Sequence, residues 1–202
     1  MIKISPRIFN ISLCFALISA ILFSLADFDV ACDDLRENVL RLHIIANSDS
    51  KADQNLKLEI RDEILKQSGD LFQNVTDVDA AVKIAATKTN EFCEIANRVI
   101  LENGFSYKAE ARVEKTFFET RVYDDFTLPA GVYEALVITL GKAKGKNWWC
   151  VIYPEVCIPA AVKGDLEDTV SKNSADIAKS KTKYIAKFKI VEIYEQIKKY
   201  IK

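Results

Sequence analysis

The sequence is poor in the residues that interrupt regular structure and in those that most often perform acid–base catalysis. Its 202 residues include only 6 glycines, 4 prolines and 1 histidine. So little glycine and proline excludes a collagen-like or low-complexity chain. The 28 basic and 29 acidic residues nearly cancel, so the chain lacks the basic footprint of a nucleic-acid-binding protein. What is present is a half-hydrophobic chain long enough for one domain with its own core.

The N-terminal segment has the pattern of an export signal. Two basic residues, Lys3 and Arg7, precede an uncharged, mostly apolar run at 8–25. The small residues Ser24 and Ala26 then occupy the third-last and last positions before a signal-peptidase cleavage site. An apolar run of about 18 residues is also long enough to span a bilayer. A cleaved signal peptide and an uncleaved signal anchor both remain open, and either one brings the chain into contact with a membrane and places its bulk outside the cytoplasm.

The character of the sequence changes along the chain and predicts four regions. Residues 1–26 are the signal peptide or signal anchor, and the acidic stretch 27–38 is expected to be an irregular spacer. Helical and alternating hydrophobic patterns place an α+β domain at 39–158. Residues 159–202 are expected to form a loop and a lysine-rich C-terminal helix.

Hydrophobic periodicity predicts the elements of the α+β domain. The expected strands are 39–45, 107–113, 132–140 and 148–153, and the expected helices are about 50–67 and 76–103. The last two strands flank a short turn, which predicts a hairpin. The order of strand, two helices, three strands and helix predicts two helices packed on one face of an antiparallel sheet of about four strands.

The C-terminal helix carries an apolar stripe among many lysines. The stripe consists of Ile190, Ile193, Tyr194, Ile197 and Ile201. Three placements fit this pattern: packing on the domain, lying on an anionic membrane surface, or binding a partner. Packing on the domain is expected, because the stripe is narrow and contains no tryptophan.

The cysteines suggest a disulfide more than a metal site. Cys150 and Cys157 are close in sequence and are candidates to pair in an exported protein. A zinc site would need further ligands, and there is neither a second close cysteine pair nor a nearby histidine. The sequence therefore predicts no metal and no cofactor.

His43 is the one candidate general base near neutral pH. Ser48 and Asp49 follow it, but their spacing matches no nucleophile motif, which favours a structural or binding role for the histidine. Adjacent strand residues point to opposite faces, so one of Trp148 and Trp149 is expected in the core and the other is a candidate interface anchor. The spacing of these residues thus matches no known catalytic arrangement, and the chain is not expected to be an enzyme.

Three separate blocks, in order, resemble the stage II sporulation protein R family. The first is Leu42–Ser50, followed by Asp53-Gln54, Leu56-Lys57 and Arg61-Asp62. The second is Leu128–Leu136, and the third runs from Gly141 through Gly145-Lys-Asn-Trp-Trp-Cys to Pro154. Ala143 stands where the third block of the family tends to have another glycine. The resemblance covers about residues 40–157 and leaves out the lysine-rich tail.

The resemblance implies a secreted signal of endospore-forming bacteria. Such a protein is made in the forespore, crosses the forespore membrane into the intermembrane space, and activates a membrane-embedded aspartic protease that processes a sigma-factor precursor. The alternatives are an extracytoplasmic hydrolase that uses His43 and a structural cell-envelope module. For signalling, the candidate partner contacts are His43, Asn47, Ser48, Asp49, Trp148 and Trp149.

Overall fold

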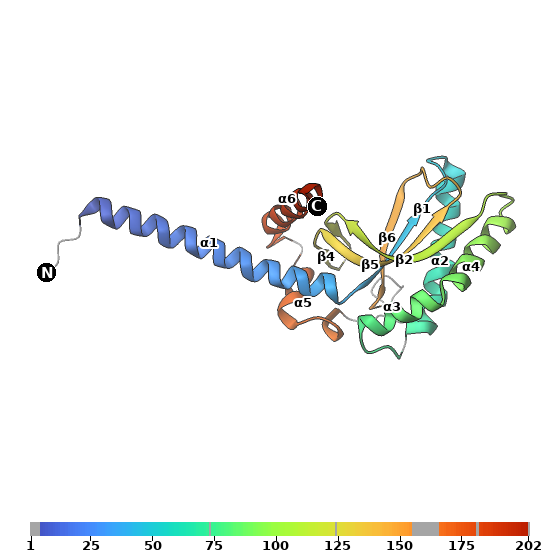
Figure 1. The fold of residues 1–202 in the computed structure, drawn as a ribbon, viewed down its shortest axis with the longest axis horizontal. Helices are drawn as coiled ribbons and strands as arrows, with labels where there is room; N and C mark the ends of the chain where they lie inside the picture. Colours follow the sequence, from blue (N-terminus) through green and yellow to red (C-terminus); the bar gives the residue numbers. More distant parts are fainter. Residues whose placement is uncertain (1–4, 73, 124, 155–165, 181, 202) are drawn as a thin grey trace.

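The computed structural model describes residues 5–72, 74–123, 125–154, 166–180 and 182–201. It has an α+β fold built around a four-stranded sheet, with a small two-stranded sheet beside it (Figure 1). The elements are α1 (Pro6–Glu37), β1 (Leu40–Ile45), α2 (Lys51–Phe72), α3 (Val78–Thr87), α4 (Thr89–Glu102), β2 (Ala109–Phe118), β3 (Arg121–Val122), β4 (Thr127–Leu128), β5 (Gly131–Leu140), β6 (Asn147–Tyr153), a 3-10 turn (Leu166–Asp168), α5 (Lys172–Lys179) and α6 (Ile185–Ile201).

The main sheet is mixed, with the strand order β2-β5-β1-β6. β1 runs parallel to β5, while the β1–β6 and β2–β5 pairs are antiparallel. The expected purely antiparallel sheet is therefore wrong. The expected hairpin of β5 and β6 is also wrong, because β1 lies between them. Alternation assigns side chains to faces but does not say which strand is the neighbour, and a short connection can pass over the end of an intervening strand.

Three helices, α2, α3 and α4, cover one face of the sheet. Leu42 and Ile44 of β1 point into this core, where they meet Leu56 and Ile60 of α2 and Phe92 of α4. Two helices were expected on this face. The segment expected as one helix at 76–103 is instead split into α3 and α4 at Lys88, a residue with a non-helical backbone.

The opposite face of the sheet is partly covered by the end of α1 and by α5. Residues 27–37, expected to be an irregular spacer, are helical and belong to α1. Phe28, Ala31, Cys32 and Leu35 recur at helical spacing and are all buried. The intervening aspartates hide this stripe in the sequence, because acidic residues on the outer face of a helix resemble a solvated linker.

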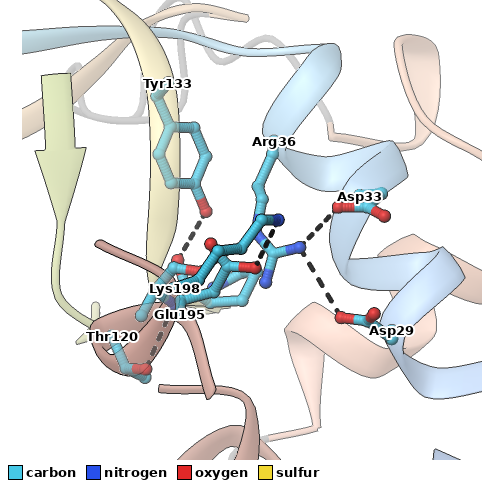
Figure 2. A network of polar contacts seen from close by, with 9 residues as sticks. Asp29, Asp33, Arg36, Thr120, Tyr133, Glu195 and Lys198 are labelled. Atoms are coloured by element: carbon cyan, nitrogen blue, oxygen red, sulfur yellow. Dashed lines mark hydrogen bonds and ion pairs between the residues drawn. The ribbon is translucent and has the colours of Figure 1, made fainter. Parts of the chain in front are cut away.

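Arg36 fastens the end of α1 to the connection between β4 and β5 (Figure 2). Its Nε donates to the Ala130 carbonyl at 2.9 Å, and its Nη1 pairs with Asp33 at 2.5 Å. A Cβ on Gly131 would lie 2.4 Å from the Arg36 Nε, so only glycine leaves room for this contact. The second sequence block therefore contains Ala130 and Gly131, the residues that Arg36 at the end of α1 contacts.

The N-terminal part of α1 projects away from the domain (Figure 1). The helix is long and apolar enough to cross a membrane, and its most apolar window has no buried residue. These properties fit both a signal sequence and a membrane anchor. The alternatives of cleavage and anchoring stay open.

Candidate functional site

The turn after β1 is joined to the connection between β5 and β6. That connection, residues 141–146, passes over the end of β1 because β1 lies between the two strands. The Lys142 N–H donates to the Asn47 Oδ1 at 2.9 Å, and the Lys146 N–H donates to the Asp49 Oδ1 at 2.7 Å. The first and third sequence blocks therefore meet in space, and their side chains hold the crossing in place.

Asp53 is the buried centre of this junction. Its carboxylate accepts hydrogen bonds from the Asn47 amide at 3.0 Å, from the Tyr107 hydroxyl at 2.6 Å and from the Ser48 hydroxyl. Burial alone would raise the pKa of Asp53, but these hydrogen bonds outweigh it and hold the pKa below its usual range. The Asp53 N–H donates to the Ser50 Oγ at 3.1 Å, so Ser50 caps the N-terminus of α2.

Backbone conformation explains the glycine pattern of the third block. Gly141 has a φ of +54°, and a Cβ there would lie 2.4 Å from the Asn47 Oδ1. Ala143 has a φ of +51°, a left-handed conformation that glycine adopts more readily. This is the position at which the resembling family tends to carry glycine. The Asn47–Asp49 turn thus uses much of its hydrogen-bonding capacity inside the protein.

His43 and Trp149 lie on the other face of the sheet as cross-strand neighbours on β1 and β6. Their ring centroids are 5.9 Å apart. The guanidinium of Arg121 stacks on Trp149, with its Cζ 3.6 Å from the ring centroid. Trp149 and Arg121 are partly exposed, while His43 is 8 % exposed. We call His43, Arg121 and Trp149 the tryptophan patch.

The tryptophan patch holds a hydrogen-bonding group that has no partner among the described residues, the buried Nε of Arg121. The buried ring of His43 interacts with the Asn147 side-chain amide. Burial lowers the pKa of His43, an effect that the nearby Asn147 amide partly offsets, so the ring is neutral at pH 7. An unpaired buried donor such as the Arg121 Nε carries a desolvation cost.

A fully buried arginine, Arg41, lies next to the tryptophan patch. Arg41 is 0 % exposed, and its Cζ lies 4.0 Å from the Phe118 ring centroid. Its Nη2 donates to the Tyr123 hydroxyl at 2.6 Å, and that hydroxyl donates to the Trp149 carbonyl at 3.3 Å. Sequence reasoning did not single out Arg41 or Arg121. Arg41 could have been recognised from its place within a strand of mostly hydrophobic residues, whereas no local sequence pattern distinguishes Arg121.

Trp148 points to the helix-covered face, as expected for adjacent strand residues. It is partly buried against the core there, and the Arg61 guanidinium lies 4.5 Å from its ring centroid. The two tryptophans therefore belong to different surfaces. Cys150, the next residue, is disulfide-bonded, and Cys157 lies outside the described residues, so their pairing stays a prediction.

The predicted site residues do not assemble a nucleophilic triad. The Ser48 hydroxyl donates to Asp53, and Asp49 accepts from the Lys146 backbone, so neither bonds to His43. In the described part of the chain, no group of three or more histidine, cysteine, aspartate or glutamate side chains could hold a metal ion. A cleft of about 710 Å³ lies elsewhere, between α1, α6, β2 and β5, and its acidic and basic side chains nearly balance.

Comparison with known proteins identifies the family. No solved structure matches the fold. Stage II sporulation protein R of Bacillus subtilis (strain 168) is 37 % identical over 121 residues, which are 60 % of this chain and 54 % of the relative. The chain thus spans about half the length of that curated relative. The family model for stage II sporulation protein R (spore_II_R) matches residues 36–163, more than half of the chain, from Arg36 at the end of α1 through all three sequence blocks. The chain therefore belongs to the stage II sporulation protein R family.

Proposed function

We propose that this protein is an exported sporulation signal that activates a membrane-embedded aspartic protease by direct contact. The protease then processes a sigma-factor precursor. Membership of the family supports a role in sporulation. The apolar N-terminal helix supports export from the forespore into the intermembrane space, where the domain would meet the outer surface of the protease.

The observation that carries the proposal of direct contact is the tryptophan patch. A partly exposed tryptophan under a stacked guanidinium is typical of interface anchors. The Arg121 side chain is partly exposed, so its guanidinium can donate to a carboxylate or carbonyl oxygen of a partner. We therefore assign the patch to an extracytoplasmic segment of the protease that presents a carboxylate or carbonyl oxygen.

Asn47, Ser48 and Asp49 have a different role in this proposal. The side chains of Asn47 and Asp49 hold the crossing of residues 141–146 over β1, which sets the register of β6 and hence the position of Trp149, while the Ser48 hydroxyl donates to Asp53 in the same junction. These residues therefore position the contact surface and are not themselves assigned to the contact. Trp148 supports it from the opposite face of the same strand.

The experiment replaces the patch in a spore-forming host and follows processing of the sigma-factor precursor by immunoblot. We expect Trp149→Ala and Arg121→Gln each to reduce processing by about tenfold, because interface anchors typically contribute 1–2 kcal/mol or more. Leu101→Ala is the matched control, since Leu101 is an exposed apolar residue of α4. Normal processing by both patch variants, with normal protein levels, would contradict the proposal.

The same assay separates the alternative functions. His43→Phe keeps an aromatic ring in the patch but removes the candidate base of a hydrolase. Processing that survives in this variant would end the hydrolase hypothesis. Loss of envelope integrity with intact processing would instead favour a structural cell-envelope module.

A further inference from the structure

The C-terminal helix α6 has two apolar faces, of which the domain uses one. Its inner face carries Phe188 and Val191, which pack with Phe28, Ala31 and Cys32 of α1. Phe28 and Phe188 meet edge to face, with ring centroids 5.0 Å apart. The inner face therefore attaches α6 to α1.

The outer face of α6 is exposed. It carries the stripe that was expected to pack on the domain, yet Ile193 is 48 % exposed and Ile197 is 52 % exposed. The other members of the stripe are exposed as well: Ile190, Tyr194 and Ile201. The helix packs on the domain as expected, but through Phe188 and Val191 on its other side and not through the stripe. An exposed apolar stripe of this length marks a surface that binds something else.

The position of α6 indicates what covers this stripe. Lys187 donates through its Nζ to the Ser24 carbonyl at 3.0 Å and to the Ser24 Oγ at 2.7 Å. Ser24 lies near the end of the apolar run of α1. In Figure 1, α6 lies beside the C-terminal half of α1, on the side of the domain from which the apolar half of α1 projects. A membrane that takes up this half of α1 would therefore meet α6.

The charge of α6 suits an anionic surface. Residues 183–199 contain five lysines and two glutamates. Lys189 pairs with Glu192 at 2.6 Å, and Lys198 pairs with Glu195 at 3.2 Å, so an excess of positive charge remains. Apolar side chains flanked by lysines are the pattern of helices that lie in the plane of a membrane interface. Lysines near such a surface are attracted to anionic headgroups.

We propose that α6 is an interfacial helix that lies on an anionic bilayer, with its outer stripe at the boundary of headgroups and acyl chains. A lipid surface fits better than a protein partner because α1 delivers the membrane to this side of the domain. The packing of α6 on α1 is kept whether or not the export signal is cleaved. Phe28, Ala31 and Cys32, which hold α6, all follow the candidate cleavage site after Ala26.

The test places a tryptophan on the stripe of the full chain and measures its quenching by lipids. The Ile197→Trp variant is reconstituted in nanodiscs of phosphatidylcholine and phosphatidylglycerol with brominated acyl chains, and the wild-type emission of Trp148 and Trp149 is subtracted. We expect the added emission to fall about twofold or more relative to unbrominated discs, because an interfacial side chain reaches the acyl boundary. Leu101→Trp is the matched control and should not be quenched.

Two further samples make the outcome decisive. Adding Ile193→Gln and Ile190→Gln to Ile197→Trp leaves the inner face intact and should abolish the quenching. Quenching of Ile197→Trp no greater than that of Leu101→Trp would overturn the proposal, as would burial of the stripe in a dimer detected by cross-linking. Equal quenching in pure phosphatidylcholine discs would overturn the requirement for an anionic surface.

Discussion

Gly145 lies against the backbone of Ser48, so close that a Cβ on Gly145 would be 2.2 Å from the Ser48 carbonyl oxygen. The Gly145 N–H also donates to the carbonyl of Ala46 at 2.8 Å. These contacts join residues almost 100 positions apart in sequence, at the point where the β5–β6 connection crosses β1. The two sequence blocks are thus two sides of one backbone-to-backbone junction, which needs glycine for its close approach.

The first prediction concerns this junction. Gly145→Ala should lower the free energy of unfolding by about 2–3 kcal/mol, because the new methyl group meets backbone that cannot move away cheaply. Gly104→Ala is the matched control. Gly104 has a φ of +76° but no neighbour within 4 Å of an added Cβ, so only the backbone penalty of about 1 kcal/mol applies. Urea denaturation of both variants measures the difference, and equal losses would show that the junction tolerates a side chain.

The second prediction concerns the buried carboxylate. Asp53→Asn should cost about 2–3 kcal/mol of stability, because the charged acceptor of three side-chain donors is replaced by a neutral amide. Glu94→Gln, an exposed change on α4, should stay within about 0.5 kcal/mol of wild type. Urea denaturation at pH 7 measures both. A neutral effect of Asp53→Asn would mean that the network does not depend on the charge.

Sequence patterns predicted which face of the sheet most strand side chains point to, but not the order in which the strands pair. Leu42 and Ile44 point to the helices, while Arg41 and His43 point to the opposite face, as alternation required. The pairing of β1 with both β5 and β6 could not be predicted, because it depends on contacts between distant residues. Adjacent strand positions also placed Trp148 and Trp149 on opposite faces correctly.

The tryptophan patch was only half predictable. His43 and Trp149 could be named from their chemistry, but their contact depends on β1 lying next to β6. Arg121 belongs to a short strand where the sequence predicted none, and its stacking on Trp149 arises from tertiary structure alone. The helix at residues 27–37 was missed for a different reason: its aspartates dominated its composition, although Phe28, Ala31 and Leu35 kept a helical spacing.

The third prediction concerns pH. Because burial lowers the pKa of His43 below its ordinary 6.5, the unfolded chain binds a proton more readily than the folded protein. This contribution to stability is complete above about pH 6.5 and is lost as the pH falls toward the folded pKa. Arg41 and Arg112 face the ring and favour its neutral form, whereas Glu114 opposes them.

The measurement compares wild type with His43→Phe by urea denaturation at pH 7.0 and pH 5.5. Wild type should lose more stability between these values than the variant, by an amount that corresponds to about 1.4 kcal/mol for each unit of pKa shift sampled in this window. The carboxylates titrate in both proteins, so their contribution cancels in the difference. Parallel losses would show that His43 keeps its ordinary pKa in the folded protein.

The fourth prediction separates the two adjacent tryptophans. Trp148→Ala should lower the free energy of unfolding by about 2 kcal/mol or more, because its ring packs on the helix-covered core and under Arg61. Trp149→Ala should cost only about 1 kcal/mol, since it loses partial packing and one stacked guanidinium. Signalling should show the opposite order, with processing of the sigma-factor precursor reduced more by Trp149→Ala when protein levels are matched. If processing instead follows stability in both variants, the tryptophan patch has no contact role, because its loss would then act only through the fold.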